Sequence, residues 1–465
     1  MAAAKAEHEV PGTGDVFRTL GLPDKFMVGL DAMAITTSKS LAGFRDIPPG
    51  PHFLWAQQPD GVSRCGYWFV TSNTHRTVRV KEWDRYNETL GEPSSASRDA
   101  SLESVHSDLK PYTLHDRSKN TGSTHWSLGD PLPEWARAPG RLWNALTSAI
   151  SAEALARITG KKGVDEVFVD STDTRRDESE PATTSQVDSA NSTGLSFLFL
   201  QDFRDLQVLD LSGSRSQSGE DTSSRVEALL SRHHDDDDDD DRITEREILA
   251  ELQFTFLTGT HLGNAACLEQ WWNLVLKILL RAYQTTTTRL QFAAGVLRTL
   301  HAQLLYTEHY FGSSSDSSEP TTTTIQDRTT TKRDGPSSDR PLFQYKPHNR
   351  EKLRLALIEY KRRALSGLLS SSPSNNHSTV DHRAVVEAFE ELEAWLWRWN
   401  WDLRATEAVA AAKTTTTTTA VGRGSSSGKD DMMIMADSDE DEDEQPVVVE
   451  LDEEGREVGL VSFRD

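Results

Sequence analysis

The sequence predicts an α+β protein, with a β-rich N-terminal domain built as a sandwich or small barrel and an all-helical domain after it. Up to about residue 84, aromatic and β-branched runs alternate with short turn-forming segments, as strands do. From residue 243 onward, apolar residues recur at helical spacing instead. Polar tracts lie between and within these regions, so the low hydrophobic fraction of 36% still leaves enough apolar residues for two cores.

Three short runs in the first part are rich in aromatic or β-branched residues: 54–55, 67–70 and 77–80. The segments Pro59-Asp60-Gly61 and Ser72-Asn73-Thr74 separate them and consist of turn-forming residues. This pattern favours a sandwich or small barrel.

A further turn is expected at Pro48-Pro49-Gly50, directly before the apolar residues that start at Phe53. Proline fixes φ near −65° and glycine accepts a positive φ, so the three residues set the direction in which the next strand begins. We interpret them as structural and not as a contact for a ligand.

The middle of the chain is more mixed. Residues 133–159 predict helix, because Trp135, Leu142 and Leu146 fall near one face. Residues 195–211 return to strand-like content at Phe197–Leu200. The segment 212–242 holds a short helical stretch around 226–230 and an aspartate run that is expected to stay disordered by self-repulsion.

The second half predicts a helical bundle. Helices are expected at about 243–257, 268–279, 290–310, 348–369 and 378–412. Threonine tracts at 285–288, 321–324 and 414–419 are expected to be loop insertions, because β-branched polar runs are poor helix formers.

These patterns predict the following organisation: a flexible N-terminus at 1–13, a β-rich domain at 14–211, an acidic disordered linker at 212–242, a helical domain at 243–412 with a disordered insertion at 312–340, and a disordered acidic tail at 413–465 that includes a strand-forming segment at 446–451.

The charge balance restricts the partners. The chain has 73 acidic and 50 basic residues, a net charge of −23. Because nucleic-acid affinity depends on cations that neutralise phosphates, we expect no direct strong RNA binding, and basic protein surfaces are better partners. No apolar run reaches the roughly 20 residues that cross a bilayer, so no membrane contact is expected.

No catalytic motif is recognised, and no cofactor or metal site is expected. Cys65 and Cys267 cannot form a disulfide framework or a CxxC zinc site, which fits a reducing cytosolic or nuclear setting. We therefore expect that the protein is not an enzyme. A hydrolase in the β-rich domain is the rival hypothesis, and it would need a convergent nucleophile and base that no motif supplies.

Four tryptophans alternate at positions 395, 397, 399 and 401. On a helix this spacing scatters the rings around the axis. Core packing is the plainer interpretation, and a docking surface formed by Trp395 and Trp399 is the alternative, because tryptophan is enriched at binding hot spots.

The acidic tail ends in a short segment that is prone to form a strand: Pro446, Val447, Val448, Val449, Glu450 and Leu451. We predict that this segment binds by adding a strand to a partner sheet. Two alternatives stay open: it completes a sheet of its own N-terminal domain, or it is an unspecialised tail.

Ser438 lies among acidic residues in the same tail and is a possible site of regulatory phosphorylation. A phosphate adds roughly −1.5 to −2 charge beside the tail strand and should tighten binding to a basic groove. Equal affinity of Ser438→Ala and Ser438→Glu variants would exclude this role.

Several motifs, in order, resemble those of the A1-cistron-splicing factor family. They are Gly29-Leu30-Asp31, the segment 43–53 with Ile47-Pro48-Pro49-Gly50 and His52-Phe53, Arg64–Phe69, Val80–Asp84, Glu251–Phe256, Leu262-Gly263-Asn264, Glu269-Gln270-Trp271, Trp401-Asp402 and Pro446–Leu451. The matches span most of the chain outside the insertions, and residues 92–212 carry few of them.

This resemblance implies a helical domain similar to VHS domains and a function as an assembly chaperone of the U5 small nuclear ribonucleoprotein. Members of the family bind the RNase H-like and Jab1/MPN domains of the large central U5 protein, pre-mRNA-processing-splicing factor 8, in the U5 precursor. The protein is then expected in cytoplasm and nucleus. A permanent ribonucleoprotein subunit or an acidic adaptor is the alternative, and a subunit that contacts RNA would need a basic stripe.

Overall fold

The computed structural model describes residues 14–37, 42–59, 64–98, 108–114, 133–136, 139–176, 194–200, 203, 220–231, 243–310, 348–365, 368, 376–399, 401–403, 449–451 and 457–460. The chain divides into two compact units, 1–405 and 406–465. The predicted segment 312–340, the tract 321–324, the tract 414–419 and the aspartate run lie outside the described residues.

Two mixed or antiparallel five-stranded sheets form the N-terminal part. Sheet A has the order β8-β7-β1-β4-β9 and sheet B the order β10-β6-β5-β2-β3. The strands are β1 Asp15–Leu20, β2 Met27–Leu30, β3 Met33–Thr36, β4 Gly43–Ile47, β5 Gly50–Gln57, β6 Arg64–Thr71, β7 Val78–Asp84, β8 Thr89–Gly91, β9 Lys110–Pro111 and β10 Glu166–Asp170. A separate short parallel pair joins β11 Thr174–Arg175 to β12 Gly194–Leu195.

The two sheets pack as a sandwich, and strand β6 shows how alternation directs its side chains. Phe69 points toward sheet A, where its ring centroid lies 5.2 Å from that of Phe17 on β1. Trp68 points the other way, and its Nε1–H donates to Thr258 Oγ1 at 3.0 Å. Both faces of this central strand are therefore buried, one against a sheet and one against a helix.

The helical part follows the periodicity of the sequence. Its elements are η3 Glu134–Ala136, α2 Pro139–Thr147, α3 Ala152–Thr159, α5 Ser223–Leu230, α6 Glu245–Leu262, α7 Ala265–Asn273, the π-helix η5 Leu274–Ile278, η6 Leu279–Arg281, α8 Tyr283–Thr288, α9 Leu290–Tyr310, α11 Asn349–Tyr360, the π-helix η7 Lys361–Leu365, α13 Asn376–Leu396 and η8 Trp397–Trp399. The α+β fold class is confirmed.

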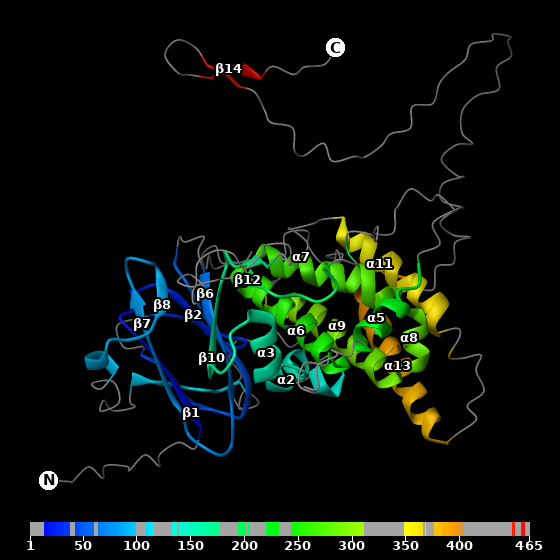
Figure 1. Ribbon diagram of the computed structural model, residues 1–465, viewed down its shortest axis with the longest axis horizontal. Helices are drawn as coiled ribbons and strands as arrows, with labels where there is room; N and C mark the ends of the chain where they lie inside the picture. The colour runs from blue at the N-terminus through cyan, green and yellow to red at the C-terminus, as the bar shows by residue number, and fades with distance from the viewer. Residues whose placement is uncertain are drawn as a thin grey trace, which may run out of the picture. The chain divides into compact units, whose positions relative to one another are not determined.

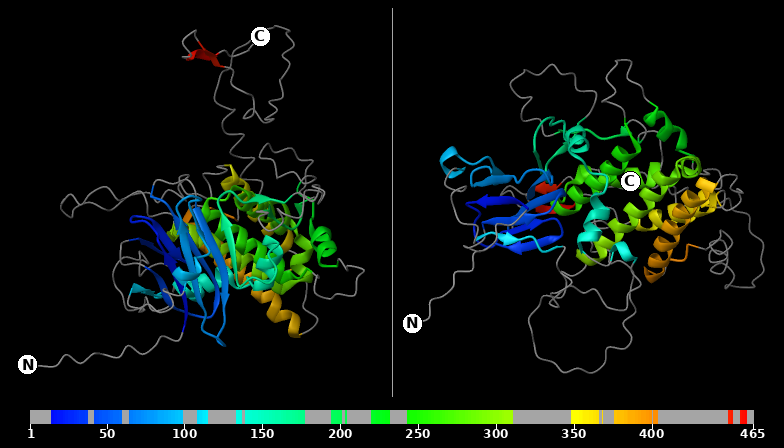
Figure 2. Two further views of the ribbon diagram at one scale, coloured as in Figure 1. Left: turned by 60° about the vertical axis from the view of Figure 1, so that its left-hand side comes forward. Right: turned by 90° about the horizontal axis from the view of Figure 1, so that it is seen from below.

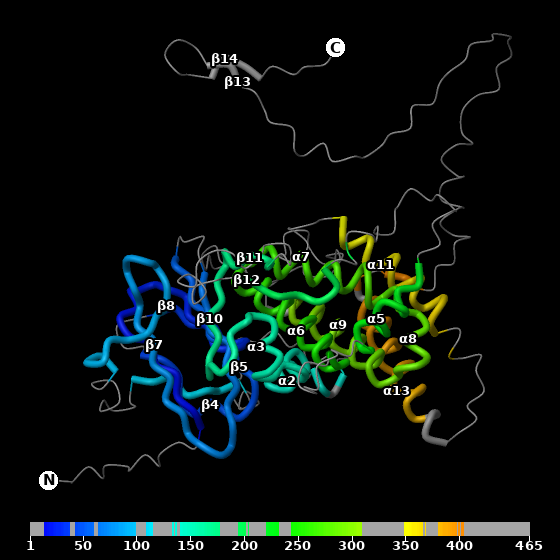
Figure 3. Tube along the Cα trace, in the orientation of Figure 1, coloured from blue at the N-terminus to red at the C-terminus, as the bar shows by residue number. Residues whose placement is uncertain are grey.

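Helices α2 and α3 lie between the strands and the long helices (Figures 1 and 2). Helix α3 contacts β6, β10 and α6, and Figure 3 traces β5 past this helix pair. The indole Nε1–H of Trp143 on α2 donates to the carbonyl of Pro51 on β5 at 3.1 Å. A continuous cluster of buried apolar side chains runs from both sheets through these helices to α13.

The prediction of a loop at Thr285–Thr288 is wrong, because these residues form most of α8. The hydroxyls of Thr286, Thr287 and Thr288 donate to backbone carbonyls about one turn earlier, as Thr286 Oγ1 does to Ala282 O at 3.2 Å. Thr286 Oγ1 also lies 2.9 Å from the hydroxyl of Tyr360 on α11. Tertiary contacts thus override the low helix propensity of threonine.

The strand-like interpretation of Phe197–Leu200 is also wrong, since Leu198 and Phe199 form a turn after β12, with Phe199 at a φ of 61°. Side chains of the helical part form hydrogen bonds with the backbone N–H and C=O of Leu198. The helical stretch predicted around 226–230 is α5, where Val226 is fully buried. This helix lies inside the range assigned to the acidic linker.

In the second unit, β13 Val449–Leu451 pairs antiparallel with β14 Glu457–Leu460. This pair forms a two-stranded sheet. No helix in the described parts of the chain is long and apolar enough to cross a membrane.

Candidate functional site

The predicted partner-binding segment is only partly described. Val449, Glu450 and Leu451 form β13. Pro446, Val447 and Val448 lie outside the described residues, and so does Ser438. The strand character of the end of this segment agrees with its sequence. Its binding role and the phosphorylation of Ser438 stay predictions.

The docking surface proposed for Trp395 and Trp399 is wrong for these two rings. Their exposed fractions are 3% and 4%, and their ring centroids lie 4.3 Å apart within the core. Trp397 is the ring that faces outward, with 54% exposed. The spacing scatters the rings as expected, but the helices packed on α13 cover the face that Trp395 and Trp399 share.

The turn at Pro48-Pro49-Gly50 is anchored from inside the sandwich. His52 Nε2 lies 2.8 Å from Pro48 O, and His52 Nδ1 lies 2.7 Å from the carboxylate of Asp31. The fully buried Asp31 also accepts from the Phe53 amide at 2.9 Å and from the Tyr112 hydroxyl at 2.7 Å. These contacts give the Gly29–Asp31 and His52-Phe53 motifs a common role in holding the turn.

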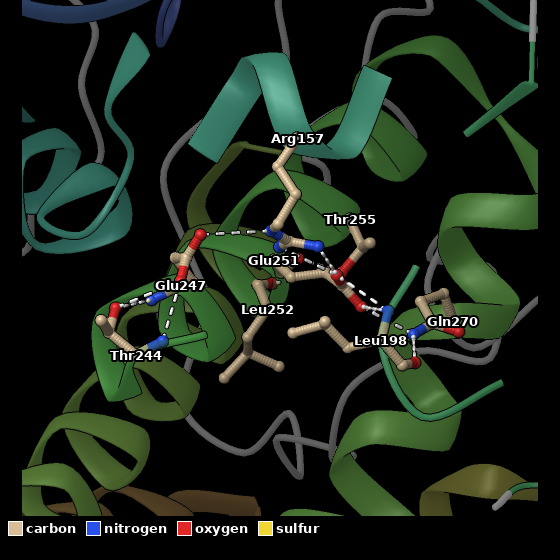
Figure 4. Close-up of polar contacts among 8 residues, drawn as sticks. All are labelled: Arg157, Leu198, Thr244, Glu247, Glu251, Leu252, Thr255 and Gln270. Carbon is tan, nitrogen blue, oxygen red and sulfur yellow. Dashed lines mark hydrogen bonds and ion pairs between the residues drawn. The ribbon is translucent and has the colours of Figure 1, made fainter. Parts of the chain in front are cut away.

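A second polar cluster joins the β-rich part to the helical part, and we call Arg157, Leu198, Glu251 and Gln270 the Glu251 joint (Figure 4). Glu251 Oε1 accepts from the Leu198 amide at 2.9 Å and from Gln270 Nε2 at 2.8 Å. Glu251 Oε2 accepts from Arg157 Nη2 at 3.1 Å. Gln270 Nε2 also donates to Leu198 O at 3.0 Å, so both backbone groups of Leu198 are bonded. One carboxylate thereby connects α3, the turn after β12, α6 and α7.

Burial raises the pKa of Glu251, whereas the guanidinium of Arg157 and the surrounding N–H donors lower it. The side chain is completely buried. Its oxygens face donors that are already positioned, and no open face remains for a substrate to approach. This carboxylate therefore serves as an acceptor of structural hydrogen bonds and not as a general base.

Gln253 of α6 and Asn264, the residue before α7, make similar hydrogen bonds. Gln253 accepts from the amide of Ala149, in the loop between α2 and α3, at 2.9 Å. Asn264 accepts from the Cys267 amide as the N-cap of α7, and its Nδ2 donates to Asp170 O at 3.0 Å and Asp173 O at 2.9 Å. The helical part thus holds the end of β10 and the α2–α3 pair by side-chain hydrogen bonds to backbone.

The two thiols have little nucleophilic character. Burial raises the pKa of Cys65 to about 11 and that of Cys267 well above its usual value. Since the thiolate is the nucleophile, each group is almost wholly protonated at neutral pH. Within the described residues, no group of three or more histidine, cysteine, aspartate or glutamate side chains is arranged to hold a metal ion.

A polar pocket of about 650 Å³ lies where α5, α6, α8, α9 and α13 approach one another. Its charged groups include Arg289, whose Nε and Nη2 each donate to Glu227 at 2.6 Å. Arg289 Nη1 donates to Glu245 at 2.7 Å. The carboxylates of Glu227 and Glu245 offset the charge of Arg289, so the lining does not favour a phosphate.

The sequence identified the motif that contains Glu251 and Gln253, but it did not assign these residues a role. A signal was available, because two long polar side chains interrupt the apolar run from Ile248 to Leu257. Polar residues inside such a run are buried and must find hydrogen-bond partners. Their partners, Arg157 and Leu198, are distant in sequence and carry no comparable signal.

Family models match two parts of the chain. The AAR2 N-terminal domain matches residues 13–160, and the AAR2 C-terminal repeat region matches residues 201–404. A search of curated proteins finds no match. The first matched range holds both sheets except β10, together with α2 and α3, and the second begins after β12 and extends through α13. Since these two domains follow each other in the expected order and take in most of the chain, the protein belongs to the A1-cistron-splicing factor (AAR2) family of splicing-related factors.

Proposed function

We propose that this protein is a non-enzymatic assembly chaperone of the U5 small nuclear ribonucleoprotein. It binds the RNase H-like and Jab1/MPN domains of the large central U5 protein in the U5 precursor, in cytoplasm and nucleus, and is displaced before the mature particle forms. In this way it supports pre-mRNA splicing without contacting RNA strongly.

The observation that carries the proposal is the strand β13 at the end of an acidic tail. Seven of the eight residues from 437 to 444 are acidic, and the strand-forming segment begins two residues later, at Pro446. A strand of a two-stranded sheet has backbone groups on its outer edge that it can offer to the edge of another protein's sheet. The acidic run favours a basic surface beside that edge.

The family assignment supports a splicing-related role. The Glu251 joint and the buried thiols supply no reactive group, which is consistent with a binding protein. The net charge of −23 disfavours the alternative of a permanent subunit that contacts RNA.

Val448→Pro tests the tail. Proline removes one N–H and should weaken the complex with a fragment holding both partner domains. It should leave the melting of the free protein unchanged. Ser426→Pro, in the same tail but outside the strand segment, is the matched control and should bind normally. Unfolding of free Val448→Pro would place the strand in the protein's own fold, and normal binding would remove the tail from the interface.

The chaperone function is tested separately by sedimentation of cell extracts. A chaperone comigrates with the precursor particle and is absent from the mature one. Presence in both particles would instead identify a permanent subunit.

A further inference from the structure

The polar pocket between α5, α6, α8, α9 and α13 has no part in the proposed function. Figure 1 shows α5, α8 and α13 together at the end of the helical part away from the two sheets. The volume of about 650 Å³ lies within the range of ligand pockets, about 300–1,000 Å³. Most ligand pockets are mainly apolar, whereas this lining consists mainly of carboxylates, hydroxyls and side-chain amides. It therefore suits a polar ligand.

The lining carries more negative than positive charge, because three carboxylates face one guanidinium: Glu227, Glu245, Asp381 and Arg289. The hydrogen bonds from Arg289 lower the pKa of Glu227, so this group is ionised at neutral pH. Arg289 donates to both oxygens of Glu227 but to only one oxygen of Glu245. Asp381 Oδ1 accepts from Gln291. Within the described residues, Glu245 Oε2 and Asp381 Oδ2 have no donor and can accept further hydrogen bonds.

A buried hydroxyl in the same lining also lacks a partner. Thr285 is 2% exposed, and its Oγ1 makes no hydrogen bond within the described residues. The other three threonines of α8 differ, because their hydroxyls donate to backbone carbonyls about one turn earlier. Buried polar groups are normally hydrogen-bonded, so this hydroxyl is available to a molecule that enters the pocket.

We propose that the pocket binds an arginine side chain that a partner protein presents on a short peptide segment. The positive charge of arginine complements the excess of carboxylates. Its five N–H donors can serve acceptors on different helices: Glu245 on α6, Thr285 on α8 and Asp381 on α13. A lysine ammonium has three donors on one nitrogen and reaches fewer of these acceptors at once.

The size of the pocket favours a peptide over a free cation, because residues next to the arginine can also enter it. The inference concerns a different part of the chain from the tail segment, and it does not depend on the proposed function.

The test titrates the full chain with three probes by saturation-transfer difference NMR: N-acetyl-arginine amide, its neutral isostere N-acetyl-citrulline amide, and the free polyamine spermidine. Asp381→Asn removes a carboxylate from the lining, and Thr285→Val removes the buried hydroxyl with little change of shape. Glu390→Gln, at an exposed position on the same helix as Asp381, is the matched control. A form lacking 437–444 removes the acidic run of the tail and so measures nonspecific attraction of cations. Melting temperatures show whether each variant is folded.

We expect the arginine amide to bind the native chain with a dissociation constant on the order of millimolar, as for a ligand of its size. The citrulline amide should bind about tenfold more weakly, because it has no charge. Asp381→Asn and Thr285→Val should each weaken binding of the arginine amide about threefold or more. Glu390→Gln and the form lacking 437–444 should bind as the native chain does.

Equal binding of the arginine and citrulline amides would overturn the site, and so would binding that neither Asp381→Asn nor Thr285→Val changes. Loss of binding in the form lacking 437–444 would assign the cation to the tail and overturn the pocket as its site. Tighter binding of spermidine than of the arginine amide would overturn the partner side chain as the occupant.

Discussion

Gly50 begins β5 with a φ of +134°, and a Cβ placed on it would meet no atom within 4 Å. Space is therefore not what requires glycine here. The requirement comes from the backbone, because this φ is one that side chains with a Cβ rarely adopt. The hydrogen bonds of His52 and Thr71 to Pro48 O hold the turn in that conformation.

We predict that Gly50→Val lowers the free energy of unfolding by about 1–3 kcal/mol through backbone strain. Denaturant unfolding measures the loss. Gly91→Val is the control, because Gly91 also has open space around its Cβ position but no positive φ. A loss of partner binding without any loss of stability would show instead that the turn is a contact site.

Asp173 and two histidines give the protein opposing responses to acid. Burial raises the pKa of Asp173 from 3.8 to about 7. Burial lowers the pKa of His261 and of His301 from 6.5 to about 3. Between pH 7 and 5.5 the folded state gains a proton on Asp173, which stabilises it. Over the same range the unfolded state gains protons on the histidines, which destabilises the fold.

Replacing Asp173 by asparagine removes only the stabilising response. We predict that Asp173→Asn loses about 1–2 kcal/mol more of its unfolding free energy than the native chain does when the pH falls from 7.5 to 5.5. Urea titrations at the two pH values measure this difference. Asp165→Asn, an exposed carboxylate on the same segment, is the control and should behave as the native chain. An equal pH response in both variants would contradict the assignment.

At the scale of elements, α6 is the helix that connects the sandwich to the other helices. Its side chains bond to α3, to the turn after β12, to the α2–α3 loop and to β6. Removing one partner of a buried charged pair leaves the other without compensation, and this is more costly than losing an exposed contact.

Glu251→Ala is therefore predicted to destabilise the fold by about 3–5 kcal/mol, because Arg157, Gln270 and the Leu198 amide lose their acceptor. Glu251→Gln should cost less, since an amide oxygen can still accept. Glu390→Ala, on the exposed face of α13, should change stability by less than about 0.5 kcal/mol. Thermal and denaturant unfolding compare the three, and a loss of under about 1 kcal/mol for Glu251→Ala would contradict the role of the joint.

Periodicity predicted the elements whose packing is regular. Helix α9 coincides with the expected 290–310, because the apolar residues spaced by four along it, Phe292, Val296, Leu300 and Leu304, are all buried. The helix at 285–288 and the turn at 197–200 could not be predicted, since hydrogen bonds to distant residues decide both. The burial of Trp395 and Trp399 depends on which neighbours cover α13, and spacing along a helix does not contain that information. The hydrogen-bond partners of Glu251 could not be predicted either, because they lie far from it in the sequence.

For the whole molecule, residues 312–340 separate two helices that pack in the same core, α9 and α11. Their sequence is poor in apolar residues, so it offers little to offset the entropy of ordering. We predict that deleting 312–340 leaves folding and partner binding intact. The melting temperature and a binding titration with the fragment that holds both partner domains check this prediction. Loss of solubility or of the complex would count against it.

The rings of Trp68 and Phe53 stack, with their centroids 4.6 Å apart, and Trp68 also packs against Phe254 of α6. The sandwich thus has an apolar outer face that the second half of the chain covers. A fragment that ends at residue 211 would display these rings to water, a patch of the kind that drives aggregation in isolated fragments. The two family-matched regions are accordingly expected to unfold in a single calorimetric transition, and to be recovered in soluble form only when they are produced together.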